Sequence, residues 1–151
     1  MISILRTDSS HPDFILLVTQ LDDFLAEIDG EDHAFYNSLN KIDKINHVLV
    51  LYEDDVPVAC GAIREFSQDA MEVKRMFTLP ASRGKGFAIK ILSELEKWAR
   101  ELKYKKCVLE TGKRQPEAIA LYHKAGYKVI SNYDKYEGIE NSVCFEKELM
   151  K

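Results

Sequence analysis

The chain has 151 residues, of which 46% are hydrophobic and 30% are charged. This composition suits one globular domain with a sizeable core and leaves little room for a second domain. The balance of 25 acidic and 21 basic side chains, a formal charge of -4, disfavours a general polyanion-binding surface. We therefore expect no nucleic-acid partner, and keep a nucleic-acid-binding module only as a third alternative, because local basic clusters exist.

The chain shows no targeting signal, membrane span or metal-ligand pattern. Its first residues lack a basic region followed by an apolar stretch, and the early apolar run 14–18 is too short to cross a bilayer. Cys60, Cys107 and Cys144 are isolated in apolar segments, which favours buried thiols in a reducing compartment. The histidines are scattered without metal-ligand spacing. We expect a cytoplasmic protein with no membrane association and no metal.

The first predicted element is an amphipathic helix. Apolar residues recur at helical spacing from Phe14 to Ile28, after His11-Pro12-Asp13 and before Asp29-Gly30. Residues 31–46 are polar and predict a loop or short helices.

Strand character begins at residue 48. Val48–Tyr52 and Val56–Phe66 flank an acidic turn and predict an antiparallel hairpin. A third strand is expected from about Met71 to Thr78, before Pro80 ends it. In this strand Val73 and Arg75 alternate with Glu72, Lys74 and Met76.

The second half of the chain alternates helices and strands. A long helix is predicted over 88–102, with Glu96 and Arg100 spaced for an ion pair across one turn on its outer face. The later elements are a strand at 106–110, a helix from Pro116 to Ala125, and strands at 127–130 and 143–149. This order predicts an α+β domain with one central, mostly antiparallel sheet.

The segment Arg83-Gly84-Lys85-Gly86-Phe87-Ala88 joins the third strand to the long helix. Free N–H groups at a helix N-terminus, the positive end of its dipole and glycines without a Cβ together make a diphosphate site. Arg83 and Lys85 add positive charge. The register excludes both a P-loop and the Rossmann spacing. The alternative interpretation is a glycine-rich turn that only caps a helix.

This segment resembles the pyrophosphate loop of the GNAT N-acetyltransferase superfamily, Q/R-x-x-G-x-G/A, which Arg83-x-x-Gly86-x-Ala88 matches. The stretch 115–127 resembles the second motif of the family, N-x-x-A-x-x-L-Y-x-x-x-G-F/Y, with Gln115 in place of the commoner Asn. The resemblance implies a GNAT-like mixed, mostly antiparallel sheet with a splayed strand pair, flanked by helices on both faces. Residues 1–151 would form one acyl-CoA N-acyltransferase domain.

The resemblance also implies acetyl-CoA as cosubstrate, bound in a cleft between the strands 72–78 and 106–111. The cofactor-binding residues expected from it are Met76, Phe77, Thr78, Arg83, Gly84, Lys85, Gly86, Phe87, Ala88 and Gln115.

Direct acetyl transfer to an amine needs an acid and a base. A phenol with a pKa near 10 is protonated at neutral pH and can donate to a CoA thiolate, so Tyr122 is the expected acid; its alternative is a core tyrosine. Glu72 matches the strand glutamate that several family members use as base, although an ion-paired strand residue is equally open. Glu110 is the alternative base. A backbone N–H near Phe77 is expected to stabilise the tetrahedral intermediate.

The expected acceptor is a primary amine of a small molecule or peptide. Candidate substrate-binding residues, with surface packing as the alternative for the aromatic and amide side chains, are Phe35, Tyr36, Glu110 and Tyr133, together with Asn40, Tyr136 and Asn141. Cys107 is discounted as a nucleophile because its neighbours are apolar. A non-catalytic CoA-binding regulatory domain remains the main alternative function, and the chain is expected to be a monomer or homodimer.

Overall fold

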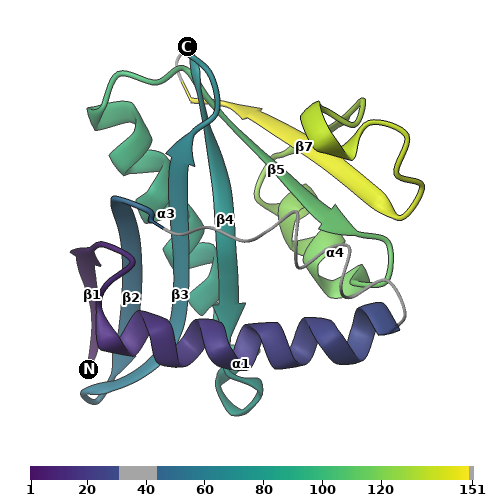
Figure 1. Cartoon of the computed structure of the whole chain (residues 1–151). Helices are drawn as coiled ribbons and strands as arrows, with labels where there is room; N and C mark the ends of the chain where they lie inside the picture. The colour runs from purple at the N-terminus through teal and green to yellow at the C-terminus, as the bar shows by residue number, and fades with distance from the viewer. Residues whose placement is uncertain (31–43, 150–151) are drawn as a thin grey trace.

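A computed structural model describes residues 1–30 and 44–149 (Figure 1). The strands are β1 (Ile2–Thr7), β2 (His47–Glu53), β3 (Val56–Glu65), β4 (Ala70–Thr78), β5 (Lys106–Gly112), β6 (Lys128–Ile130) and β7 (Ser142–Glu148). The helices are α1 (Pro12–Asp29), α3 (Phe87–Glu101) and α4 (Pro116–Lys124), with short 3-10 helices at Pro80–Ser82 and Asp134–Tyr136. No helix of this described part is long and apolar enough to cross a membrane.

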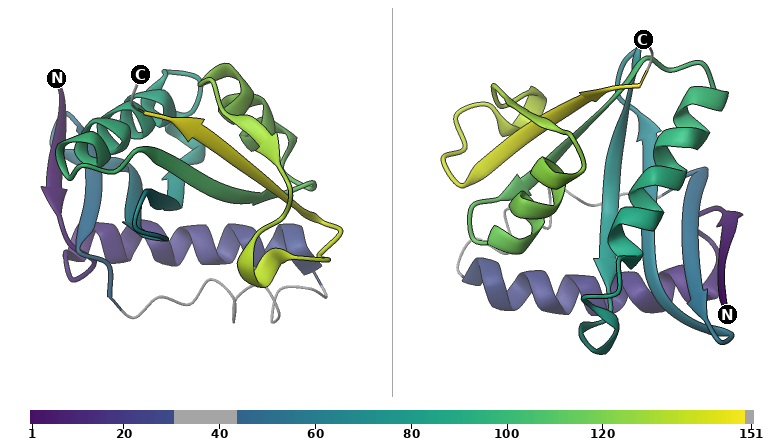
Figure 2. Two further views of the ribbon diagram at one scale, coloured as in Figure 1. Left: turned by 90° about the horizontal axis from the view of Figure 1, so that it is seen from above. Right: turned by 180° about the vertical axis from the view of Figure 1, so that it is seen from behind.

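The described strands form one seven-stranded sheet in the order β1-β2-β3-β4-β5-β7-β6. Each neighbouring pair is antiparallel except β4 and β5, which run parallel. Helix α1 covers one face, and α3 and α4 cover the other (Figure 2). The expected α+β class, with a mixed, mostly antiparallel sheet between helices, is confirmed.

Strand β1 is missing from the sequence-based order, which began with a helix. It pairs with β2 from Ile2↔Glu53 to Thr7↔Val48. An edge strand has a partner on one side only, and Ile2 and Leu5 are exposed, so β1 carries only a weak alternating pattern. Its pairing with β2, rather than its own side chains, makes it a strand.

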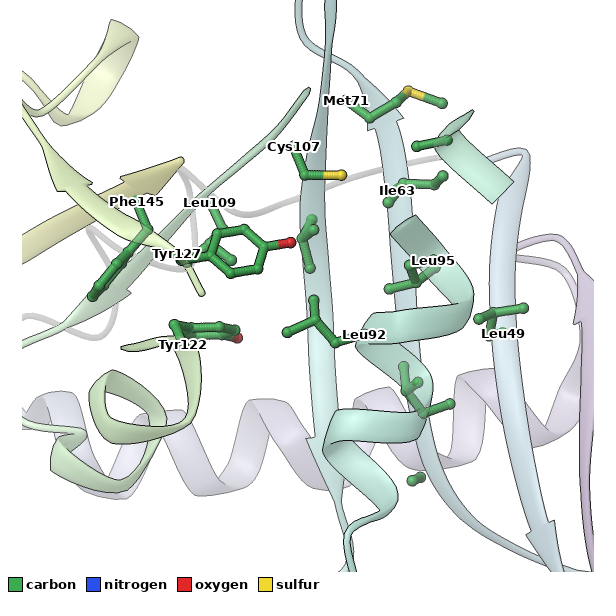
Figure 3. Packing of buried hydrophobic residues seen from close by; sticks show 14 of the residues in the cluster. Leu49, Ile63, Met71, Leu92, Leu95, Cys107, Leu109, Tyr122, Tyr127 and Phe145 are labelled. Atoms are coloured by element: carbon green, nitrogen blue, oxygen red, sulfur yellow. The ribbon is translucent and has the colours of Figure 1, made fainter. Parts of the chain in front are cut away.

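Two apolar cores lie on opposite faces of the sheet because strand side chains alternate. In β2, Leu49 and Leu51 pack against the α3 side, whereas Val48 and Val50 pack against α1. Figure 3 shows the α3-side core from close by. Gly61 lets α3 approach β3 closely, since a Cβ there would lie 2.7 Å from the Ile91 Cγ2 atom.

Strands β4 and β5 pair only over Ala70–Glu72 and Lys106–Val108 and then diverge (Figure 1). On the other edge of β4 the register with β3 shifts, so that Arg75 and Met76 stand opposite one residue. Arg75 has a φ of 58°, the left-handed conformation of a bulge. The expected alternation of Val73 with Met76 is therefore wrong, because both side chains pack against the α3-side core. The expected splayed strand pair is present.

The expected ion pair on the outer face of the long helix is also wrong. Glu96 is buried and accepts hydrogen bonds from the Tyr127 hydroxyl and from Lys147 Nζ, both at 2.9 Å. Lys147 Nζ donates a second bond to the Ala125 carbonyl at 2.8 Å. Glu96 thus ties α3 to β7 and to the end of α4.

Candidate active site

A cleft of about 910 Å³ opens where β4 and β5 diverge. This volume lies in the usual range for small-molecule sites. The cleft is lined by α1, β4, the loop before α3, the first turn of α3, the end of β5 and α4. It therefore runs from the glycine turn to the residues of the second sequence motif.

The glycine turn at one end of the cleft has the geometry of an anion site. Gly84 and Gly86 have φ values of 83° and 81°, and Gly86 is the N-cap of α3. Helix geometry leaves the N–H groups of the next residues, 87–89, without helical acceptors, at the positive end of the dipole. No atom lies within 4 Å of a Cβ built on either glycine. The turn thus presents free donors with space in front of them.

The two cations of the turn point in different directions. Arg83 lines the cleft, donates from Nε to the Thr78 carbonyl at 3.0 Å, and lies with its guanidinium 5.0 Å from the Phe24 ring centroid. Lys85 does not line the cleft, and its Nζ lies 3.2 Å from the Glu53 carboxylate. Only Arg83 therefore offers its charge at the cleft mouth.

The backbone at the end of β4 presents a donor to the cleft. The Leu79 N–H bonds to the Val58 carbonyl on β3 at 2.9 Å. Because strand N–H groups alternate in direction, the Phe77 N–H also points toward β3, and that of Thr78 points to the open edge. Met76, Phe77 and Thr78 all line the cleft, and the N–H group of Thr78 is better placed than that of Phe77.

Tyr122 lies at the other end of the cleft, on α4. Its ring packs between Tyr127 and Phe145, with centroid distances of 5.9 and 5.8 Å, and Figure 3 shows both tyrosine hydroxyls pointing toward α3. Its hydroxyl makes no hydrogen bond to any described residue. Burial, with the negative charge of Glu110, raises the pKa of Tyr122 above its usual value. The phenol therefore stays protonated and lines the cleft as a donor.

Glu110 and Lys74 carry opposite charges in the same cleft. Burial raises the pKa of the Glu110 carboxyl, while nearby Ser142 and Lys74 lower it. Burial also lowers the pKa of Lys74 to about 8. Lys74 is 8% exposed, and its Nζ donates to the Tyr136 hydroxyl at 3.3 Å. Both groups can thus change charge more readily than surface residues of the same type.

Glu72 lies outside the cleft lining. It is 1% exposed and pairs with Val108 in the last rung between β4 and β5. One carboxylate oxygen accepts from Arg64 Nε at 3.1 Å, and the other accepts from the Tyr133 hydroxyl at 2.8 Å. Both oxygens are therefore bound by neighbouring side chains.

The expected acceptor-site residues divide into three groups. Glu110 and Asn141 line the cleft. Tyr133 and Tyr136 do not; their rings meet edge to face with centroids 5.8 Å apart, and Tyr136 is fully buried rather than on the surface. Phe35, Tyr36 and Asn40 lie outside the described residues. Gln115 lines the cleft at the N-terminus of α4.

Sequence reasoning missed several lining residues. Lys74 was not among the predicted site residues, although a lysine inside a buried strand is itself an unusual signal. Phe24 and Asp29 of α1 also line the cleft, and nothing in a helical pattern distinguishes them from ordinary packing residues. Cys107 is buried and free, and burial raises its pKa to about 12, so it is a poor nucleophile.

Comparison with known proteins identifies the family. The model of the Acetyltransferase (GNAT) family matches residues 15–127, and the chain belongs to this family. The uncharacterized N-acetyltransferase YjgM of Escherichia coli (strain K12) is 41% identical over 85 residues, which cover 54% of this chain and 50% of that protein. The chain thus spans only half the length of that relative.

Two further relatives match over nearly their whole length. The IAA acetyltransferase of Azospirillum brasilense is 29% identical, with 98% of each chain covered. A crystal structure from Klebsiella pneumoniae, named for acyl-CoA N-acyltransferase activity, superposes with a TM-score of 0.82 at 29% identity, over 99% of each chain. The chain is accordingly a member of an acetyltransferase family, and the backbone donors of the glycine turn suit a molecule that carries a diphosphate group.

Proposed function

We propose that the chain transfers an acetyl group directly from acetyl-CoA to a primary amine, with residues 1–151 acting as one acyl-CoA N-acyltransferase domain. The observation that carries this proposal is the cleft itself, which joins a diphosphate site, an open strand edge, a protonated tyrosine and a carboxylate. The diphosphate would lie on the turn formed by Arg83, Gly84, Lys85, Gly86, Phe87 and Ala88. The pantetheine arm would then run along Met76 and Thr78 toward Tyr122, past Gln115.

The geometry favours Glu110 over Glu72 as the base. Glu110 lines the cleft and has a raised pKa, which brings a carboxyl closer to the pKa that suits proton transfer at neutral pH. Glu72 lies outside the cleft and holds Arg64 and Tyr133. We therefore assign Glu72 to anchoring the segment that contains Tyr133, next to the site.

The proposed reaction balances with these residues alone. Glu110, directly or through a water, takes a proton from the acceptor ammonium, and the neutral amine attacks the thioester carbonyl. The backbone donors on the open edge of β4 stabilise the oxyanion. As the C–S bond breaks, Tyr122 gives its proton to the CoA thiolate and regains one from the new amide nitrogen. Amide and CoA thiol leave, and one proton is released to solvent from Glu110.

The first test is thermal unfolding with and without acetyl-CoA, because a ligand that binds only the folded state raises the apparent stability. We expect a clear rise in Tm that Gly86→Glu abolishes. Gly138→Glu is the matched control: Gly138 has a similar φ of 76° with no atom near its Cβ, but it lies outside the cleft lining. No rise at millimolar acetyl-CoA would refute cofactor binding.

A second test separates the enzyme from the alternative of a non-catalytic CoA-binding domain. An enzyme releases CoA thiol when amines are added, and this release falls in Tyr122→Phe and Glu110→Gln without loss of the Tm rise. A regulatory domain shows the Tm rise with no CoA release from any amine. We place the enzyme in the cytoplasm, because three free, buried cysteines suit a reducing compartment.

A further inference from the structure

The guanidinium of Arg83 lies over two aromatic rings at the mouth of the cleft. Its Cζ atom is 5.0 Å from the ring centroid of Phe24 and 5.8 Å from that of Phe77. Its Nε donates to the Thr78 carbonyl at 3.0 Å. Among the residues that the structure describes, no carboxylate pairs with Arg83, and neither of its Nη groups makes a hydrogen bond. The side chain is thus held by neutral contacts, and its two outer nitrogens are available to an anion.

The two rings belong to different elements. Phe77 lies on β4 and is 7% exposed in the α1-side core. Phe24 lies on α1, packs partly buried against the same core, and lines the cleft. The two ring centroids are 6.4 Å apart, with an interplanar angle of 50°. Phe24 is therefore a contact between α1 and the glycine turn, which are far apart in the sequence.

Helix α1 holds Phe24 in place independently of the turn. Leu17 and Leu21 are buried in the α1-side core, and Phe24 continues their face of the helix, because residues three or four apart are neighbours on a helix surface. Asp22 also pairs with Arg75 on β4, at 2.8 Å. The ring therefore has a defined position before any ligand binds.

A ring in a defined position matters because Arg83 is exposed and lies on a loop. A long side chain in that setting loses rotamer freedom when it binds an anion, and this cost lowers the affinity. A cation over an aromatic face is attracted by the ring, whereas the guanidinium N–H groups point outward in their own plane and can still donate. Arg83 and both glycines of the turn line the same cleft. The ring thus orders the cation beside the diphosphate site in advance.

We propose that Phe24 is a positioning residue for the diphosphate of acetyl-CoA, which holds the guanidinium of Arg83 beside the glycine turn. This inference rests on the proposed function and deepens it, because it adds to the cofactor site a residue of α1 that lies outside both sequence motifs. Phe24 acts through Arg83 and does not itself bind the diphosphate.

The test is a double-mutant cycle on the affinity for acetyl-CoA, measured by calorimetric titration. Phe24→Leu keeps an apolar side chain and removes the ring. It should raise the dissociation constant about two- to fivefold, the usual worth of an exposed cation–π contact. In an Arg83→Met background the same substitution should have no effect, because the cation is gone. The backbone donors of the turn keep binding measurable in that background.

Two control variants keep the result specific. Phe24→Tyr retains the aromatic face and should bind acetyl-CoA as the wild type does. In a Lys85→Met background, Phe24→Leu should keep its full effect, because the Lys85 ammonium pairs with Glu53 instead. If Phe24→Leu does not fold, Phe24→Met takes its place, since a flexible thioether fills irregular apolar space.

Two outcomes would overturn the inference. One is an unchanged dissociation constant in Phe24→Leu. The other is an equal rise in the presence and in the absence of Arg83, which would mean that the ring acts by packing or by direct contact with the cosubstrate. If the wild-type protein does not bind acetyl-CoA at all, the proposed function itself fails.

Discussion

The paired and the splayed ends of β4 and β5 each carry a glutamate, and the two carboxylates have different neighbours. Glu72 belongs to the last paired rung, where Arg64 and Tyr133 bind both its oxygens. Glu110 lies just past that rung, where the strands have separated, and it lines the cleft. A buried carboxylate with its oxygens bound supports structure, whereas one that borders open space can exchange protons with a ligand. The glutamate before the point of strand separation therefore has a structural role, whereas the one after it is available for proton transfer.

The largest expected effect on activity comes from a substitution of Glu110, at the splayed end of the two strands. Glu110→Gln should lower kcat by about 10³-fold, because general base catalysis is worth about 10² to 10⁴. The acid limb of the pH profile of kcat/KM should disappear with it, since that limb would report the carboxyl losing its proton. The measurement is steady-state CoA release across pH. A variant with more than a tenth of wild-type kcat would exclude Glu110 as the base.

Tyr122→Phe removes only the hydroxyl and should lower kcat by about 10²-fold, in the range for an acid that donates in the transition state. The ring contacts with Tyr127 and Phe145 remain, so the free energy of unfolding should change by less than about 1 kcal/mol. Kinetics and denaturant unfolding of the same preparation check both parts. A loss of stability without a loss of kcat would favour a core tyrosine.

Lys74→Met should stabilise the protein at pH 7 by about 3 kcal/mol, the free energy of a pKa displaced from 10.5 to about 8. Between these two pKa values the unfolded chain holds a proton that the folded protein has released, so wild-type stability rises with pH across that window. The gain from the substitution should therefore be full below pH 8 and vanish above about pH 10.5. Urea unfolding at several pH values tests this, and a gain independent of pH would contradict it.

At the paired end, Glu72→Gln and Tyr133→Phe should each cost about 1.5 to 3 kcal/mol of stability, the worth of a hydrogen bond to a charged group. Their effects should add only in part in the double variant, because both weaken the hydrogen bond between Tyr133 and Glu72, whereas Glu72→Gln also weakens the contact with Arg64. We expect kcat to stay within about tenfold of wild type. If Glu72→Gln instead removes activity while Tyr133→Phe does not, Glu72 is the base and the comparison between the two ends fails.

The smallest effect on stability and on acetyl-CoA binding is expected from a substitution of Lys85. Its side chain is engaged by Glu53, and both are partly exposed, so Lys85→Met should change stability by less than about 1 kcal/mol. The acetyl-CoA dissociation constant should rise by no more than about threefold, whereas Arg83→Met, which alters a cleft residue, should raise it further. Calorimetric titration of the two variants provides the comparison.

The sequence by itself determined the features that depend on local order. The turn before α3 has its glycines where the backbone takes positive φ, and α3 and α4 follow from periodic apolar residues and from Pro116. The two motifs are continuous in the chain, so their resemblance to one family could be recognised without knowing how distant segments meet. The splayed pair followed from that resemblance.

Only the tertiary structure decided which charged residues border the cleft. Glu72, Lys74 and Glu110 are alternate positions in two strands, and no local pattern tells where those strands separate. The bulge at Arg75, the burial of Glu96 against Lys147 and the pairing of β1 with β2 likewise depend on segments far apart in the chain. A side chain becomes structural or chemical according to the neighbours that packing gives it, and sequence order does not contain those neighbours.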